Sequence, residues 1–171
     1  MKKNILLTIV LGLSFLIINS TYAQDGNRNL GFGLQSSFPT YGLSAKFGIS
    51  EKLLGQVIVA PFASAKSKDF GYSVNFFGAR ANYRLSDPDA SAVPYAFAGA
   101  GVIRSSMTFM GNKTTNSYLG WNLGAGIEFF PGFADNLSAS AELGYGSMNV
   151  NSAGISVSGL SFGLGLHYYV N

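Results

Sequence analysis

The chain has 171 residues, of which 47% are hydrophobic and only 11% are charged, and its formal net charge is +3 at pH 7. Lys and Arg form no cluster, which argues against a nucleic-acid or phosphate-binding surface. Cysteine is absent, so an exported chain of this size needs a good core or a closed hydrogen-bonded barrel in place of disulfides.

The N-terminus predicts a secretory signal peptide over residues 1–23. Met1-Lys2-Lys3 is a basic start, residues 5–18 form a mostly apolar run, and Ala23 offers a small residue for cleavage. The run is shorter than the roughly 20 apolar residues of a spanning helix, which argues against the alternative of a membrane anchor. We therefore expect one mature domain over residues 24–171, whose nine basic and eight acidic side chains leave a net charge of +1.

Eight segments alternate between large apolar residues and small or polar ones, with turn signals between them. The predicted strands cover residues 28–37, 41–50, 53–64, 70–86, 94–104, 117–130, 137–147 and 155–170. In the fourth segment the apolar positions are even from Phe70 to Phe76 and odd from Phe77 onward. This switch predicts a β-bulge near Phe76. The fifth segment is too rich in Ala and Gly for its two faces to be assigned.

Two architectures fit eight alternating strands: a soluble barrel with its apolar face inward and a membrane barrel with that face toward lipid. One face carries mainly Gly, Ser and Asn, which suits a narrow interior, and the other carries Trp, Phe, Tyr, Leu and Ile. A soluble barrel would need an outer face rich in Lys and Glu, and this chain has few charged residues. The sequence therefore predicts an all-β, eight-stranded antiparallel up-and-down transmembrane β-barrel in the cell outer membrane.

Both termini of such a barrel are expected in the periplasm. This assigns each turn, and each girdle of aromatic residues, to either the periplasmic or the external end of the barrel. Periplasmic turns are expected near residues 50–52, 87–93 and 131–136, and external loops near residues 39–40, 66–69, 105–116 and 149–154. Girdles are expected from Tyr83, Tyr95, Phe129 and Tyr168 at one rim, and from Tyr41, Phe62, Phe70 and Tyr145 at the other. The loop from Ser105 to Asn116 carries Met107, Phe109 and Met110 and is the candidate contact surface for a partner; the alternative is a hairpin that extends past the membrane.

Several stretches carry a family resemblance through their order and spacing. They are "VPYAFAGAGV" at residues 93–102, "GAGIEF" followed by "ADNLSASAELGYG", and the closing "GLGLHYYV". The chain resembles the small eight-stranded outer-membrane β-barrels of Gram-negative bacteria, the group that includes the OmpA transmembrane domain and the porin-like OmpX. The resemblance implies two partners, outer-membrane lipid and the barrel-assembly machinery, and an assembly signal formed by Gly165, Leu166, Tyr168 and Val170. Some members carry a peptidoglycan-binding domain after the barrel, which we do not expect here.

The candidate site lies on the inward face. Its charged residues are Lys46, Arg80, Arg84, Glu128 and Glu142, with His167 as the single histidine of the chain. Charges in a narrow lumen are costly unless they are paired, and the signs nearly balance, so we expect a lumenal ion-pair network. Arg80 and Glu142 are expected at similar depth and the others nearer the periplasmic mouth, where Arg84 alternatively faces water.

The function that this pattern favours is a structural or surface-interaction role with a lumen plugged by ion pairs. A low-conductance pore, whose ion pairs exchange partners, is the alternative, and a lipid-modifying enzyme comes third. Catalysis needs a nucleophile with its base in reach, and from the sequence no serine can be paired with His167. The Gly-x-Gly pairs open no helix and make poor phosphate loops. We therefore expect no catalytic residue, no cofactor, no metal and no nucleic-acid partner.

Overall fold

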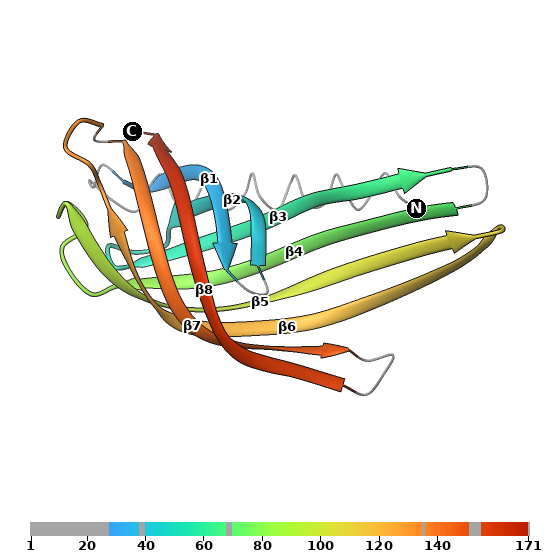
Figure 1. Ribbon diagram of the computed structural model, residues 1–171. Helices are drawn as coiled ribbons and strands as arrows, with labels where there is room; N and C mark the ends of the chain where they lie inside the picture. The colour runs from blue at the N-terminus through green and yellow to red at the C-terminus, as the bar shows by residue number, and fades with distance from the viewer. Residues whose placement is uncertain (1–27, 38–39, 68–69, 135, 151–154, 171) are drawn as a thin grey trace.

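The computed structural model describes residues 28–37, 40–67, 70–134, 136–150 and 155–170, so the expected signal peptide lies outside the described residues. Each strand pairs antiparallel with the next, and the last pairs with the first, which closes the barrel (Figure 1). The strands are β1 (Leu30–Ser37), β2 (Thr40–Gly48), β3 (Leu53–Lys66), β4 (Phe70–Arg84), β5 (Ala92–Phe109), β6 (Asn112–Phe129), β7 (Leu137–Val150) and β8 (Ile155–Val170). The all-β, up-and-down barrel expected from the sequence is confirmed. Within the described ranges, no helix is long and apolar enough to span a membrane.

The register of the ladders sets the tilt of the strands. Paired residues followed from Leu34 through β2 to β7 lead to Ser156 on β8. Leu34 itself pairs with Leu166, so the closed ladder is staggered by ten residues along β8. An eight-stranded barrel closed in this way has an interior just wide enough for side chains to fill.

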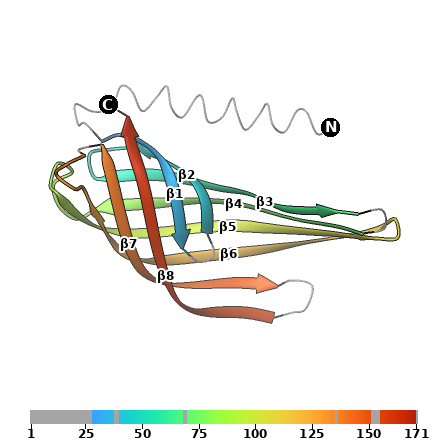
Figure 2. The same cartoon turned by 45° about the horizontal axis from the view of Figure 1, so that its top comes forward.

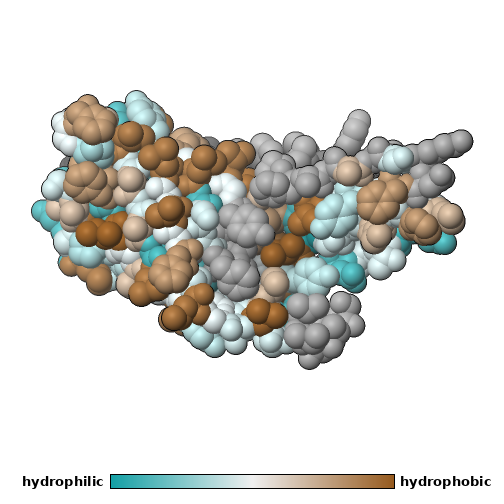
Figure 3. All heavy atoms as spheres, viewed as in Figure 1, coloured by the Kyte–Doolittle hydropathy of each residue, from teal (hydrophilic) through white to brown (hydrophobic). Residues whose placement is uncertain are grey.

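The two faces of the wall have opposite character. On β6, Leu123 points outward and is 52% exposed, whereas the next residue inward, Asn122, is 1% exposed. Outward positions on β4 to β8 are apolar over about nine to eleven residues, the length that spans a bilayer. Figure 3 shows such apolar side chains spread across the wall. Lipid therefore covers the surface that a soluble barrel would have to keep polar.

Glycine on the inward face is required where two strands approach too closely for a side chain. A Cβ atom on Gly33 would lie 1.9 Å from the carbonyl oxygen of Leu166, and one on Gly124 would lie 2.3 Å from that of Leu143. Real Cβ atoms do not approach backbone oxygens this closely. The low strand propensity of glycine is thus offset by a lumen with no room for larger residues.

The strands differ in length, and the longer ones project from one end of the barrel. β1 and β2 have eight and nine residues, whereas β3 to β8 have 14 to 18. Figures 1 and 2 show β3 to β6 continuing as a sheet well past the end of β1 and β2. We call this part of β3 to β6 the projecting sheet.

The prediction of a loop from Ser105 to Asn116 is wrong, because all but the two turn residues of this segment belong to strands of the projecting sheet. β5 and β6 stay paired out to Phe109 and Asn112, and only Met110 and Gly111 form the turn. Both have positive φ, 46° and 81°, as a tight two-residue hairpin turn requires. The polar residues that suggested a loop continue the strands outside the membrane. The alternative of a hairpin extending past the membrane is what the structure shows.

The bulge expected near Phe76 is also wrong. β4 pairs with β5 without interruption from Phe70 to Arg84, and the irregularity lies on β3, between Pro61 and Ser64. Phe76 faces inward and packs with Ile58 and Ala60.

The parity switch at Phe76 and Phe77 instead marks the level where the sheet leaves the membrane. Outward positions change from apolar to polar above this level, as from Phe77 to Asn75 on β4 and from Val102 to Arg104 on β5. Inward positions change the opposite way: on β4 they are apolar above this level, at Val74, Tyr72 and Phe70. Water on the outer face of the projecting sheet explains the inversion, since that face no longer meets lipid.

The predicted girdles are found only in part. Outward, exposed rings are those of Tyr83, Phe129, Tyr168 and Tyr145. Tyr95 was assigned wrongly, because it is 3% exposed and points into the lumen. Phe70 lies on the inner face of the projecting sheet, above the level of a girdle. The side chains of Tyr41 and Phe62 are outside the described part of the structure.

Candidate functional site

The centre of the lumen holds an ion pair between Arg80 of β4 and Glu142 of β7. Nη1 of Arg80 donates to Oε2 of Glu142 at 3.1 Å, and Nη2 donates to Oε1. Asn82 accepts from Nε and Nη2 of the guanidinium at 3.3 Å, and the Tyr95 hydroxyl donates to Oε1 of Glu142 at 2.6 Å. The ring of Phe97 lies 4.4 Å from the guanidinium carbon. The pair is buried and bidentate, the geometry in which an arginine–carboxylate contact is strongest.

A second ion pair joins Lys46 of β2 to Glu128 of β6. Nζ of Lys46 lies 2.8 Å from Oε1 of Glu128, and both side chains are buried. The same oxygen accepts from the hydroxyls of Ser138 at 2.6 Å and Tyr169 at 3.0 Å. Three donors on one carboxylate oxygen compensate the cost of removing this charge from water.

A chain of polar side chains links the first ion pair to His167. Asn82 donates to Oε1 of Gln56 at 3.0 Å, and Nε2 of Gln56 donates to the Ser44 hydroxyl at 2.7 Å. That hydroxyl lies 2.9 Å from Nε2 of His167. The prediction that no serine pairs with His167 is therefore wrong, because β2 places Ser44 beside it across the lumen.

The Ser44–His167 contact lacks the rest of a catalytic triad. Nδ1 of His167 has no hydrogen-bond partner among the described residues, so no carboxylate orients the ring there. Both side chains are buried, and Gln56 already donates to the serine oxygen. The neighbouring cavity, lined by Lys46, Leu54, Asn82, Arg84, Tyr95 and Glu128, is too small to hold a water molecule. The contact belongs to a packed polar interior.

Arg84 lies at the periplasmic mouth without joining either ion pair. It is buried, and its Nη2 donates to the backbone oxygen of Arg28 at 3.0 Å, so the alternative that it faces water is wrong. Arg28 in turn donates to the carbonyls of Pro88 and Ala90 at 3.0 and 3.1 Å, and its guanidinium stacks 3.6 Å from the ring of Phe130. Through Phe130, Arg28 also contacts a buried cluster formed by Val93, Phe130 and Tyr169. Arg28 thus joins Arg84, the turn at Pro88 and Ala90, and Phe130 at this end of the barrel.

Several members of the lumenal network carry no charge and were not found from the sequence. They are Ser44, Gln56, Asn82, Tyr95, Ser138 and Tyr169. Most share the inward parity of a charged residue on the same strand, which is a signal that could have found them. Gln56 and Tyr95 have no such neighbour in the lumen-lining parts of β3 and β5, and the many Ala and Gly residues of β5 also hide which of its faces is inward. No group of His, Asp or Glu in the described ranges could hold a metal ion.

The expected assembly signal lies on β8. Leu166, Tyr168 and Val170 point outward and are exposed, whereas Gly165 lies on the inward row beside Ser140 and Gln35. Recognition of these residues by assembly machinery stays a prediction.

An apolar belt around a closed barrel with a buried polar lumen defines an integral outer-membrane protein. The chain belongs to the outer membrane protein beta-barrel domain family, whose model matches residues 8–168. It is an outer-membrane protein. No curated protein matches the sequence.

Solved structures with the same fold are small outer-membrane barrels. Ail, the attachment invasion locus protein of Yersinia pestis, is 16% identical, with a TM-score of 0.55 over 86% of this chain and 100% of that one. Neisserial surface protein A is 19% identical, with a TM-score of 0.51 over 82% and 93%. The N-terminal β-barrel domain of Pseudomonas aeruginosa OprF is 17% identical, with a TM-score of 0.50 over 81% and 95%. At these identities the likeness shows the fold alone.

Proposed function

We propose that the protein is a non-conducting, non-enzymatic outer-membrane barrel that holds a contact surface outside the cell. The observation that supports the plug is the bidentate Arg80–Glu142 pair, backed by the Lys46–Glu128 pair, with all four side chains buried. Both pairs have neutral hydrogen-bond partners of their own. Opening a path would require breaking charged contacts between buried groups, which is costly.

The proposed contact surface is the inner face of the projecting sheet. Its exposed apolar residues come from paired positions on β4 and β5, Tyr72 with Met107 and Phe70 with Phe109, and Met110 caps the tip. Arg104 and Lys113, the charged residues of β5 and β6 above the membrane level, both have outward parity. An apolar face left uncovered in water is typical of a binding surface. This proposal keeps the partner site in the segment from Ser105 to Asn116.

Single-channel recording of the refolded protein in a planar bilayer tests the plug. We expect no steady conductance from the native chain. Arg104→Ala, on the outer face of the projecting sheet, is the control and should record as the native chain does. A steady native conductance that changes on Arg80→Ala or Glu142→Ala would establish the low-conductance pore instead.

Binding assays on whole cells test the contact surface. We expect Met107→Asn and Phe109→Asn to reduce capture of surface partners, while Thr108→Asn, on the opposite face of the same strand, leaves it unchanged. Equal capture by all three variants and by a chain lacking residues 105–116 would rule out this surface.

A further inference from the structure

Among the described residues, the outward apolar row of β8 extends further than that of β1. β1 pairs with β8 only between Gly163 and Val170, and its described residues end at Ser37, opposite Gly163. The outward apolar row of β8 continues for longer, to Phe162 and Leu160. With eight residues, β1 falls just short of the nine to eleven that span a bilayer. The β1–β8 seam therefore lies beside outward apolar side chains of β8 that extend past the described part of β1.

The exposed fraction of the outward side chains of β8 increases from Leu166 toward Phe162. Leu166 is 49% exposed, as is usual for this belt, whereas Leu164 is 70% and Phe162 76% exposed. Leu164 lies opposite the small Ser36, and Phe162 has no described residue of β1 opposite it. The outward side chains of β8 are therefore more exposed along the outer part of the seam.

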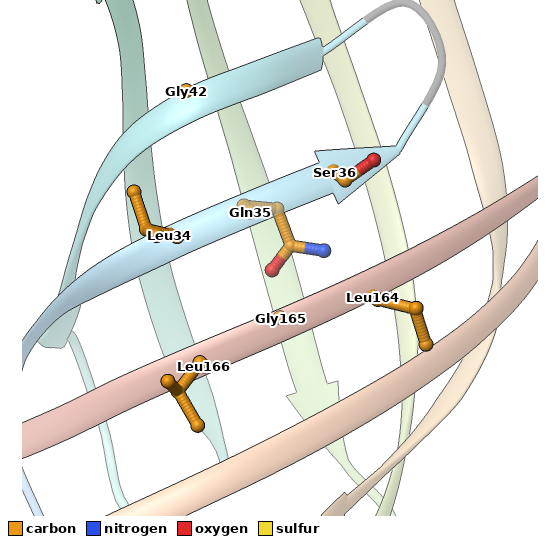
Figure 4. Close-up of a pocket in the computed structure, with 7 residues that line it drawn as sticks. All are labelled: Leu34, Gln35, Ser36, Gly42, Leu164, Gly165 and Leu166. Carbon is orange, nitrogen blue, oxygen red and sulfur yellow. The ribbon is translucent and has the colours of Figure 1, made fainter.

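A groove of about 300 Å³ follows the seam on the lipid-facing side (Figure 4). Its apolar walls are Leu34 of β1 and Leu164 and Leu166 of β8, and the remaining lining residues are Gln35, Ser36, Gly42 and Gly165. Three of these four are small, which is why the groove is hollow. None of the lining residues is charged.

We propose that this groove seats one acyl chain of an outer-membrane lipid. The groove opens onto the belt that lipid already covers, so the occupant comes from the bilayer without crossing water. A chain lying between Leu34 and Leu164 contacts apolar atoms on two sides, whereas a chain on the flat part of the belt contacts them on one. The seat therefore holds its lipid longer than the rest of the belt. This inference needs only the membrane location and is independent of the plug.

Native mass spectrometry tests the seat. The protein is refolded into vesicles of phosphatidylethanolamine and phosphatidylglycerol, extracted in mild detergent and weighed with its retained lipid. We expect one lipid per native chain. Ser36→Leu fills the groove and should lower retention about ten-fold, the effect of roughly two lost methylene contacts. Ser36→Ala leaves the groove open and should retain lipid as the native chain does.

The matched control is Ala98→Leu, which adds bulk to an exposed belt position on β5. It should leave retention unchanged. Leu164→Ala removes one wall of the groove and should also lower lipid retention. It replaces Ser36→Leu if that variant does not show the heat-dependent gel shift of a folded barrel. A native chain without retained lipid, equal retention by Ser36→Leu, Leu164→Ala and the native chain, or an equal loss in Ala98→Leu would overturn the proposal.

Discussion

The guanidinium of Arg80 and the carboxylate of Glu142, 62 residues apart in the chain, meet across the lumen through two hydrogen bonds. Asn82 and Tyr95 contact the remaining edges of the pair. A buried ion pair is tolerated when such additional hydrogen bonds replace lost hydration. The packing of the lumen thus depends on four side chains that no local segment contains.

Removing one member of this pair should destabilise the barrel strongly. We expect Arg80→Ala to lower the free energy of unfolding by about 3–5 kcal/mol, because Glu142 is left buried without its countercharge. The double variant Arg80→Met with Glu142→Leu should lose less than Arg80→Ala, since no unpaired charge remains. Urea unfolding in lipid vesicles measures all three chains. A double variant at least as unstable as Arg80→Ala would contradict this account.

Tyr95 offers a finer test of the same contact. Tyr95→Phe removes only the hydroxyl that donates to Glu142 at 2.6 Å. A hydrogen bond to a charged group contributes about 1.5–3 kcal/mol, so the free energy of unfolding should fall by that amount. Tyr83→Phe, at an exposed outward ring, is the control and should change little. Equal losses would mean that the Tyr95 contact contributes no more than a ring at the lipid surface.

The lipid-facing assignment predicts a depth-dependent cost for charge. Leu123→Arg, near the middle of the belt on β6, should cost about 2–4 kcal/mol, and Ser106→Arg, on the outward face of the projecting sheet, about 0–1 kcal/mol. A small polar change at inward Asn122, such as Asn122→Ser, should also cost less than Leu123→Arg. Unfolding from vesicles gives the comparison. A soluble protein without a heat-dependent gel shift would show that the two faces had been exchanged.

Glycine on the inward face predicts a contrast between two alanine substitutions. Gly124→Ala places a Cβ atom 2.3 Å from a backbone oxygen and should destabilise the barrel by about 1–3 kcal/mol. Gly159→Ala, near the outer end of β8, meets no atom within 4 Å and should fold as the native chain does. Thermal shift of the gel-mobility transition measures both. If Gly124→Ala were as stable as Gly159→Ala, the lumen could not be closely packed at Gly124.

Period-two alternation in the sequence was enough to determine eight strands, the lipid-facing surface and the set of inward charges. These features are local, because each residue of a strand points to the face opposite its neighbours. Where the strands end was not local. The segment from Ser105 to Asn116 reads as a loop, yet it remains in the sheet because water accepts the polar outward face that lipid would exclude.

Only the tertiary structure decided which inward residues meet. The ten-residue stagger of the closed ladder brings Arg80 to Glu142, Lys46 to Glu128 and Ser44 to His167. The pairing of β5 with β4 and β6 also shows that Tyr95 faces the lumen, at a position where Ala and Gly give no sign of the inward face. Parity along one strand cannot reveal depth across a tilted barrel, since that depth is set by the closure of all eight strands.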